Sequence, residues 1–386
     1  MFERELSDLR QRHMFRKPLV IESREGPRII INGRSLLLMC SNDYLGLSFH
    51  PALREAATAA LVRYGCGAGA SRLICGTSEV HAELEERIAR FKNTEKAVVY
   101  NSGYAANTGI ISAIAGPGDI ILSDNLNHAS IIDGCRLSRA QVAVYRHRDM
   151  NHLEDLLRKA TSIGRRLIVT DGVFSMDGDI APLPELVSLS EKHNALLMVD
   201  DAHAVGVLGK TGKGTAEHFG LESRVPIQMG TLGKALGSFG AYAAGSRDFI
   251  NFLINRSRSF IYSTALPPSV CAASIAAIDI VERESGLKKR VWKNRDRLVS
   301  GLSRLGVSYG SSESVIIPIV IGDTEKTLNA GNRLFECGIF ASAIRPPTVA
   351  EGSARVRITV MATHCDDDID IALDALDRCK TEGFFG

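Results

Sequence analysis

Lys234 has the surroundings that best suit covalent chemistry in this sequence. It lies in the segment GTLGKALG, after the apolar run that starts at residue 225, and Gly230, Gly233 and Gly237 remove bulk around it. A lysine that forms a Schiff base must be accessible, partly desolvated and close to an electron sink. Taken alone, a lysine after a strand is most often a solvated surface charge, so the interpretation needs support from other residues.

Asp200 gives the first support, because it ends the apolar run LLMVD, where an unpaired carboxylate would be costly to bury. A pyridinium nitrogen is a natural partner, since an aspartate keeps this nitrogen protonated and makes the ring an electron sink. His203 could donate a hydrogen bond to the ring hydroxyl, and Ser175 could bind nearby. The alternatives are a helix-capping or ion-paired aspartate and a structural histidine.

Gly103 and Tyr104 open a predicted helix directly after the apolar run AVVY and the residues NS. Backbone N–H groups at the start of a helix bind phosphate, and a glycine permits close approach. Thr231, Ser263 and Thr264 offer hydroxyl donors for the same phosphate. The alternative is an ordinary turn between strand and helix.

His128 and Arg345 complete the candidate set. His128 follows another strand and could stack on the face of the ring. Arg345 precedes two prolines that fix the backbone, so its guanidinium suits a substrate carboxylate, with a surface ion pair as the alternative. We expect Arg355 and Arg357, which alternate with apolar residues, to face solvent or an interface. The combination is far more specific than any of its members and describes a site for pyridoxal 5'-phosphate (PLP).

The elements that must position these residues recur as short apolar runs, each followed by a turn and a helical pattern. Such runs are typical of strands buried on both faces, and their alternation with helices predicts a mostly parallel sheet. The polar segments 124–128, 171–175, 200–203 and 231–234 follow the carboxyl ends of these strands. Ligands bind at that edge of open α/β sheets, so we expect these segments to form one crevice.

The chain has 386 residues, a length that favours about two domains. A long helical pattern ends near residue 285, and a different mixture of helices and strands follows. We expect an N-terminal segment over 1–45, a large domain over 46–285 and a small α+β domain over 286–386. The N-terminal segment should pack against the small domain or a partner subunit.

Composition excludes several classes of partner. With 46 basic and 44 acidic side chains, the net charge of +2 gives no electrostatic case for nucleic acid or an anionic membrane. No apolar stretch reaches the length of a membrane span, and the first 17 residues lack the apolar region of a signal peptide. We therefore expect a cytoplasmic, water-soluble protein.

The cysteines and the glycine-rich segments predict no metal or nucleotide site. The eight cysteines lack zinc-site spacing and are expected to be reduced and mostly buried thiols. Segment 65–71 does not match a dinucleotide fingerprint. Segment 206–214 does not match a P-loop, because the first glycine of that motif would fall on Ala204. We therefore expect a glycine-rich surface hairpin there.

Six segments together resemble the α-oxoamine synthases, which are aspartate-aminotransferase-like PLP enzymes of fold type I. They span residues 41–48, 67–91, 127–138, 171–183, 199–214 and 230–242. Enzymes of this family join an amino acid to an acyl-CoA with loss of carbon dioxide. The resemblance runs from about residue 40 to 365 and implies a large domain with a mostly parallel seven-stranded sheet plus a small α+β domain.

The resemblance also implies individual roles. Lys234 holds PLP covalently and later moves the Cα proton of the substrate. The other residues implied to contact the cofactor are Asp200 at the pyridinium nitrogen, His128 on the ring face, His203 and Ser175 near the ring hydroxyl, and Gly103, Tyr104 and Thr231 at the phosphate. Ser263 and Thr264 would reach the phosphate in a neighbouring subunit, which implies a homodimer with shared active sites.

The segment 343–364 is similar to the biotin-pathway member of the family. This implies L-alanine and pimeloyl-CoA, or a pimeloyl-carrier protein, as substrates. Arg345 would bind the amino-acid carboxylate, while Arg16 and Thr348 would contact the acyl substrate. The sequence departs from the pattern of the family at two positions: Ala350, where proline is usual, and Tyr104, where phenylalanine is common.

Three alternatives stay open. A glycine C-acetyltransferase (2-amino-3-ketobutyrate CoA ligase) would use glycine and acetyl-CoA at the same kind of site. A protein that binds PLP without turnover is disfavoured by the presence of the four residues Lys234, Asp200, His128 and Arg345. A Rossmann oxidoreductase is disfavoured because its glycine fingerprint is missing.

Overall fold

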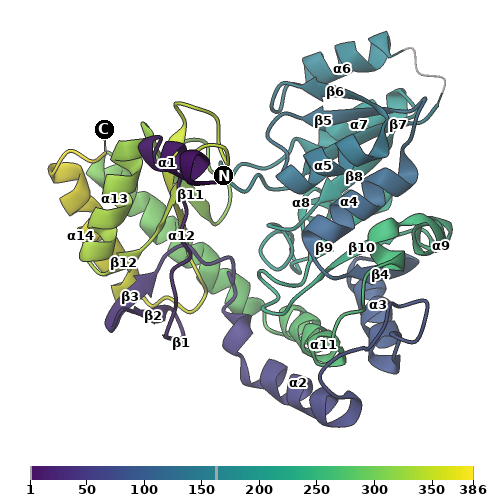
Figure 1. Ribbon diagram of the computed structural model, residues 1–386, viewed down its shortest axis with the longest axis horizontal. Coiled ribbons are helices and arrows are strands. Elements are labelled where there is room, and N and C mark those ends of the chain that lie inside the picture. Colours follow the sequence, from purple (N-terminus) through teal and green to yellow (C-terminus); the bar gives the residue numbers. More distant parts are fainter. Residues whose placement is uncertain (1, 161–163, 386) are drawn as a thin grey trace. The chain divides into compact units, whose positions relative to one another are not determined.

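The computed structural model describes residues 2–160 and 164–385, and these divide into two compact units (Figure 1). The sheet unit comprises Leu47–Ser175 and Ile180–Lys288. The terminal unit comprises the residues up to Gly46, the segment Met176–Asp179, and the residues from Lys289 onward, so it joins both ends of the chain. The division into 1–45, 46–285 and 286–386 stays a prediction.

Among the described residues, seven strands form the sheet of the sheet unit, in the order β4-β10-β9-β8-β7-β5-β6. They are β4 (Lys96–Tyr100), β5 (Ile120–Asp124), β6 (Gln141–Tyr145), β7 (Arg166–Asp171), β8 (Leu196–Asp200), β9 (Ile227–Thr231) and β10 (Ala241–Gly245). Only β10 runs against its neighbours β4 and β9 in this part of the chain; the pairs β5/β6, β5/β7, β7/β8 and β8/β9 are parallel. The predicted mostly parallel, seven-stranded sheet is confirmed.

Helices cover both faces of the central part of this sheet, which explains why its central strands are mostly apolar. Val169 and Met198 pack into a core with α4, α5 and α9, whereas their neighbours Ile168 and Leu197 pack into a second core with α6 and α7. Successive side chains of a strand point to opposite faces, so the strands β5, β7 and β8 supply both cores. The helices are α2 (Pro51–Tyr64), α3 (Glu79–Phe91), α4 (Gly103–Ile114), α5 (Ala129–Ser138), α6 (Met150–Lys159), α7 (Leu183–Lys192), α8 (Thr215–Phe219), α9 (Arg247–Arg256), α10 (Arg258–Ile261) and α11 (Pro268–Arg283).

The terminal unit contains two small sheets and the remaining helices. One sheet has the order β1-β2-β3-β12 and the other β11-β14-β13. The elements are α1 (Glu3–Gln11), β1 (Ser23–Glu25), β2 (Arg28–Ile31), β3 (Arg34–Leu38), α12 (Ser285–Leu305), which begins in the sheet unit, β11 (Ile316–Gly322), α13 (Thr324–Glu336), β12 (Ile339–Phe340), β13 (Ser342–Ile344), β14 (Ala354–Thr359) and α14 (Asp366–Thr381). β3 pairs in parallel with β12, and this pairing ties the N-terminal region to the C-terminal one.

Helix lengths and composition also bear on the membrane question. Over the residues that the structure describes, no helix combines the length and the apolar character needed to cross a membrane.

The prediction that Arg355 and Arg357 face solvent or an interface is wrong, because both side chains are buried in β14. Arg355 donates to Asp177 Oδ1 at 2.5 Å, and Arg357 donates to Asn42 Oδ1 at 3.2 Å and to the hydroxyl of Tyr44 at 3.5 Å. Asp177 comes from the short segment that the terminal unit takes from the middle of the chain. The acceptors that make this burial possible are therefore remote in sequence.

The glycine-rich segment 206–214 is also not a surface hairpin. It forms consecutive turns without strands, and Val207 and Leu208 are buried. The turns close on themselves through a 2.8 Å hydrogen bond from the N–H of Gly206 to the carbonyl of Gly212. Apolar side chains inside the segment thus draw it into the core.

The prediction that the cysteines are mostly buried is wrong as well. All eight lie among the described residues and none forms a disulfide, but only Cys135, Cys271 and Cys379 are buried. The two cysteines nearest the 65–76 turn region, Cys66 and Cys75, are exposed. They lie in the loop between α2 and α3, where the apolar residues Leu73 and Ile74 are exposed as well.

Candidate active site

One edge of the sheet collects the polar residues that the sequence placed after its strands. β4, β5, β7, β8 and β9 run in the same direction, so their carboxyl ends share an edge. Asp124, Asp171, Asp200 and Thr231 are the last residues of their strands. These four residues therefore lie at one edge of the sheet, which is the edge where ligands bind in open α/β sheets.

Lys234 lies in a tight turn that follows β9. The turn is closed by hydrogen bonds from Gly237 N to the carbonyl of Lys234 and from Leu232 N to that of Gly240, both 2.9 Å long. Gly237 has φ +63°, and a Cβ there would lie 2.3 Å from the backbone nitrogen of Ser48, so this position requires glycine. The half-buried Lys234 side chain is held on a rigid turn.

His203 contacts the amine of Lys234, with 2.8 Å between Nζ and Nε2. His203 is buried and follows Asp200 in the turn after β8. Because an ammonium group can only donate, a charged Lys234 requires the Nε2 atom of His203 to accept. This contact restricts the lysine amine without burying it completely.

Asp200 is 4% exposed and has fixed donors on both oxygens. Oδ1 accepts from the N–H of Ala202 at 2.8 Å, and Oδ2 accepts from Nδ2 of Asn107 at 2.7 Å. Asn107 lies in α4 and was missed by the sequence analysis. A polar amide between the apolar residues of this helix was the available signal.

His128 caps the start of α5, and its imidazole is exposed. Its backbone N–H donates to Asp171 Oδ2 at 2.9 Å, while Nδ1 accepts from the N–H of Ser130 at 3.2 Å. Desolvation by the surrounding protein lowers the pKa of His128 below its usual value; Asp200 opposes this shift and Lys234 adds to it. The ring is therefore uncharged at neutral pH.

Asp171 is a second buried carboxyl group at this edge, directly beside Asp200 in the register of β7 and β8. Burial and the neighbouring charge of Asp200 raise the pKa of Asp171 well above its ordinary value, while the N–H of His128 and the charge of Lys234 act in the opposite direction. Of these two adjacent carboxyl groups, Asp200 is the one with hydrogen-bond donors on both oxygens.

The start of α4 forms the proposed phosphate cradle. Ser102 caps the helix by accepting from Ala105 N at 3.1 Å. A Cβ on Gly103 would lie 2.9 Å from Cγ2 of Thr231, so the helix start and the end of β9 are in close contact. Tyr104 is exposed, and its hydrogen bond to Asp133 raises the pKa of its phenol.

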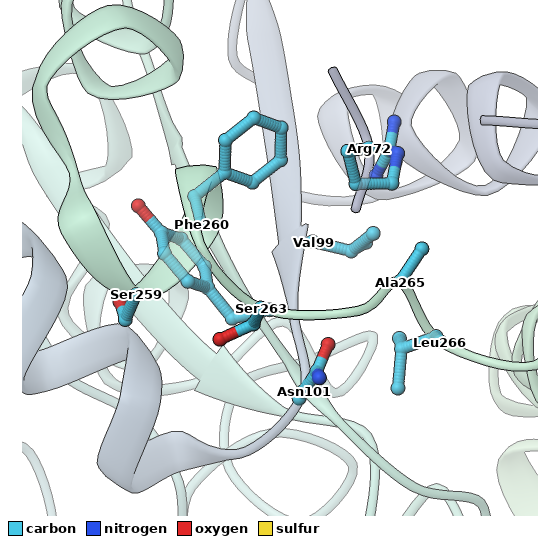
Figure 2. A pocket seen from close by; sticks show the side chains of 9 residues that line it. Arg72, Val99, Asn101, Ser259, Phe260, Ser263, Ala265 and Leu266 are labelled. Atoms are coloured by element: carbon cyan, nitrogen blue, oxygen red, sulfur yellow. The ribbon is translucent and has the colours of Figure 1, made fainter. Parts of the chain in front are cut away.

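Ser263 and Thr264 lie beside this cradle, in the segment after α10. Asn101, two residues before Gly103, donates from Nδ2 to the carbonyl of Thr264 at 2.7 Å. Figure 2 shows Asn101 and Ser263 on the wall of a small pocket beside Phe260. Ser175 is half-buried and follows Asp171 by four residues.

The three residues predicted for the substrate occur together in the terminal unit. Arg16 approaches Thr348 Oγ1 and the carbonyl of Pro346, both at 3.3 Å, and Arg345 donates to the carbonyl of Phe15 at 2.8 Å. Burial and the charge of Arg16 lower the pKa of Arg345. Nε of Arg345 is buried and has no hydrogen-bond partner within the described residues, as suits an anionic ligand.

The residues of the sheet unit fit PLP. A half-buried amine, a carboxylate with fixed orientation, an exposed neutral imidazole and a helix start without a Cβ occur together at one sheet edge. These are the donor types that a covalently held, phosphorylated pyridine requires. The charges of Lys234 and Asp200 act on the pKa of both His128 and Asp171, as expected for groups that lie close together.

Comparisons with known proteins agree with this fit. The family model of the class I and II aminotransferases matches residues 34–376. Serine palmitoyltransferase of Sphingomonas wittichii has a similar structure, with a TM-score of 0.95, 32% identity and coverage of 100% of this chain and 98% of that one. The fold and the site define a PLP-dependent enzyme of fold type I, as the resemblance predicted.

Proteins with more similar sequences identify the family within this class of enzymes. The 8-amino-7-oxononanoate synthase of Geotalea daltonii is 56% identical over 97% of this chain and 96% of its own length. The enzyme of the same name from Geobacter sulfurreducens is 52% identical over 98% of this chain and 97% of its own length. The solved structure of an 8-amino-7-oxononanoate synthase from Francisella tularensis has a TM-score of 0.77 and 29% identity. The comparison covers 91% of this chain and 99% of that one. The chain belongs to the 8-amino-7-oxononanoate synthase family.

Proposed function

We propose that this protein catalyses the PLP-dependent condensation of L-alanine with pimeloyl-CoA, which gives 8-amino-7-oxononanoate, CoA and carbon dioxide in biotin biosynthesis. The observation that carries the proposal is the convergence of Lys234, Asp200 and His128 at one sheet edge, in a chain 56% identical to an enzyme of that name. In the reaction, the alanine Cα bonds to the acyl carbon, CoA leaves as the thiol, and the alanine carboxyl group leaves as carbon dioxide.

Bound PLP supplies an electron sink that stabilises negative charge at the substrate Cα. We assign to Lys234 the covalent attachment of the cofactor and the transfer of the Cα proton. Asp200 would accept a hydrogen bond from the protonated ring nitrogen, and the imidazole of His128 would lie against the face of the ring. His203, which contacts Lys234 Nζ at 2.8 Å, and Ser175 are assigned to the ring hydroxyl.

The phosphate is assigned to two backbone N–H groups at the start of α4 and to one nearby hydroxyl, which in this structure donates to the carbonyl of Ala202 at 3.3 Å. The N–H groups are those of Gly103 and Tyr104, and the hydroxyl is that of Thr231. The helix dipole favours an anion there. A side chain on Gly103 would come within 2.9 Å of Cγ2 of Thr231, so the close approach of the helix start to β9 requires glycine here.

Arg345 is assigned to the carboxylate of L-alanine, and Arg16 and Thr348 to the acyl substrate. The buried Nε of Arg345, which lacks a partner among the described residues, supports this assignment, because an arginine binds a carboxylate through paired N–H donors. The acyl donor is pimeloyl-CoA or a pimeloyl-carrier protein.

We further propose a homodimer in which Ser263 and Thr264 reach the phosphate in the partner subunit. Supporting this, Thr264 pairs with Ser71, and the nearby side chains of Ile74 and Tyr262 are exposed although apolar. Exposed apolar groups that cluster on a surface mark contact sites. A cytoplasmic location is consistent with eight cysteines free of disulfides in the described chain.

Product analysis by mass spectrometry tests the proposal. The protein is incubated with PLP, L-alanine and pimeloyl-CoA, and 8-amino-7-oxononanoate and free CoA are expected in equal amounts. Glycine with acetyl-CoA, the substrates of a glycine C-acetyltransferase, serve as the competing pair. Faster turnover of that pair, or no product with alanine and pimeloyl-CoA, would overturn the proposal.

A further inference from the structure

Two buried polar side chains connect Asp200 to His128. Asn107, 1% exposed and part of α4, donates from Nδ2 to Asp200 Oδ2 at 2.7 Å and to Ser130 Oγ at 2.9 Å. Ser130, fully buried at the start of α5, places its Oγ 2.7 Å from Nδ1 of His128. The chain of hydrogen bonds from Asp200 to His128 is continuous.

The chemistry of the groups fixes the direction of each hydrogen bond. A carboxylate only accepts, so Asn107 must present its amide N–H groups to Asp200 and to Ser130. Ser130 Oγ accepts from Asn107 and can therefore direct its own proton to His128 Nδ1. Nδ1 also accepts from the backbone N–H of Ser130 at 3.2 Å, so the proton of the neutral imidazole is on Nε2.

Packing does not account for an asparagine at this position. Oδ1 of Asn107 is buried and has no hydrogen-bond partner in the described part of the chain, which is an unfavourable state for a polar atom. The surrounding α4 side chains Ala106, Ile110 and Ile111 are buried and apolar. An apolar residue of the same size would avoid the cost, so the amide N–H groups are the feature that the position provides.

We propose that Asn107 is a positioning residue of the PLP site, which sets Asp200 and His128 as one hydrogen-bonded unit through Ser130. The proposal rests on the proposed function, because it takes Asp200 and His128 to be cofactor contacts. The fixed Oδ2 directs the carboxylate toward the ring nitrogen. The acceptor state of Nδ1 keeps the imidazole uncharged, so it does not repel a protonated pyridine stacked on it.

Two substitutions of Asn107 separate the effects. Asn107→Leu removes both donors, while Asn107→Asp places a second carboxyl group against Asp200, and the pair would share a proton. For both variants, we expect the Kd for PLP to rise and kcat to fall by about 10- to 100-fold, which is the range for a lost hydrogen bond to a charged group. The KM for alanine should change less. The pH dependence of the absorbance of bound PLP should shift, because Asp200 stabilises the ring proton less well.

Asn294→Leu is the matched control, since Asn294 is also buried and donates from Nδ2 to two carbonyls, of Met361 and His364, both at 2.9 Å. It should lose stability and keep the Kd for PLP and the pH dependence of the absorbance. If Asn107→Leu kept the wild-type Kd for PLP and the wild-type pH dependence of the absorbance, while the wild type forms product, the positioning role would be overturned. The proposed function would be retained. A wild type that binds no PLP would overturn the proposed function instead.

A measurement without cofactor tests the hydrogen bonds themselves. NMR of protein labelled with ¹⁵N-histidine should show that His128 is protonated on Nε2 and unprotonated on Nδ1. The Ser130→Ala variant should show a weaker preference for this tautomer. A proton on Nδ1 in the wild type would overturn the proposal. If Asn107→Leu does not fold, Ser130→Ala decides: we expect a higher Kd for PLP, and an unchanged Kd with an unchanged tautomer would contradict the inference.

Discussion

The ammonium group of Lys92 lies 3.0 Å from Oδ2 of Asp201, and each side chain is only 1% exposed. Asp201 also accepts from the backbone N–H of Thr215 at 3.1 and 3.2 Å on its two oxygens, and Lys92 donates to the carbonyl of Lys213. Asp201 is the direct neighbour of Asp200. The two adjacent carboxylates therefore have separate partners, and the buried lysine holds the second one away from the site.

Lys92→Met should destabilise the protein strongly, because it leaves Asp201 buried without a compensating charge. The expected loss in the free energy of unfolding is about 3–5 kcal/mol, measured by urea denaturation. The double variant Lys92→Met/Asp201→Asn should recover part of this loss, since it removes the second charge as well. An equal loss in the single and double variants would show that packing, and not the unpaired charge, is responsible.

Lys234→Ala should abolish most turnover, because the amine is assigned both the covalent attachment of the cofactor and the transfer of the Cα proton. We expect the activation barrier to rise by about 4–8 kcal/mol, measured as kcat with alanine and pimeloyl-CoA. Lys210→Ala, at an exposed lysine of the 206–214 turns, is the control and should keep wild-type kcat. Substantial turnover by Lys234→Ala would remove the lysine from the mechanism.

Arg345→Ala should weaken alanine binding more than it slows the chemical steps. The expected rise in KM for alanine is about 10- to 100-fold, which corresponds to the loss of hydrogen bonds between charged groups, with a smaller fall in kcat. Arg345→Lys should restore little, because an ammonium group lacks the planar pair of donors. Steady-state kinetics at varied alanine concentration measure both parameters, and an unchanged KM in Arg345→Ala would exclude the assignment.

His364 should make the stability of the protein depend on pH in the acid range. It is buried, accepts from Met361 N at 3.0 Å through Nδ1, and lies 3.1 Å from the carbonyl of Leu38 through Nε2. Burial lowers its pKa to about 4 from the usual 6.5, while the carbonyl of Leu38 opposes the shift. Between these values the unfolded chain binds more protons, so stability should fall as the pH drops from 6.5 to 4, by up to about 3 kcal/mol.

Urea midpoints at a series of pH values test this dependence. His364→Asn keeps an acceptor near Nδ1 but does not titrate, so its stability should be lower at pH 7 and fall less steeply between pH 6.5 and 4. His218→Asn, at an exposed histidine, is the control and should follow the wild-type curve. Parallel curves for His364→Asn and the wild type would show that another group titrates.

The strands and the main site residues could be predicted from the sequence because their signals are local. An apolar run followed by a polar residue identifies both a buried strand and its carboxyl end, as for Asp200 at the end of β8 and Lys234 after β9. Once several strands run in parallel, their ends must share one edge, and the residues there meet without further information. Lys234, Asp200 and His128 belong to this class.

The residues that the sequence analysis missed or misjudged depend on contacts between distant segments. Asn107 meets Asp200 across 93 residues, Lys92 meets Asp201 across 109, and Arg355 is buried only because Asp177, 178 residues away, accepts from it. A helix sequence specifies which face is apolar, but not which polar group of another element will face it.

The order of residues along this chain thus determined its strands, their shared edge and the reactive groups placed there. Tertiary packing alone decided which buried polar atoms pair, since the cost of burying a charge or an amide is relieved by whichever donor or acceptor the folded chain brings within hydrogen-bond distance.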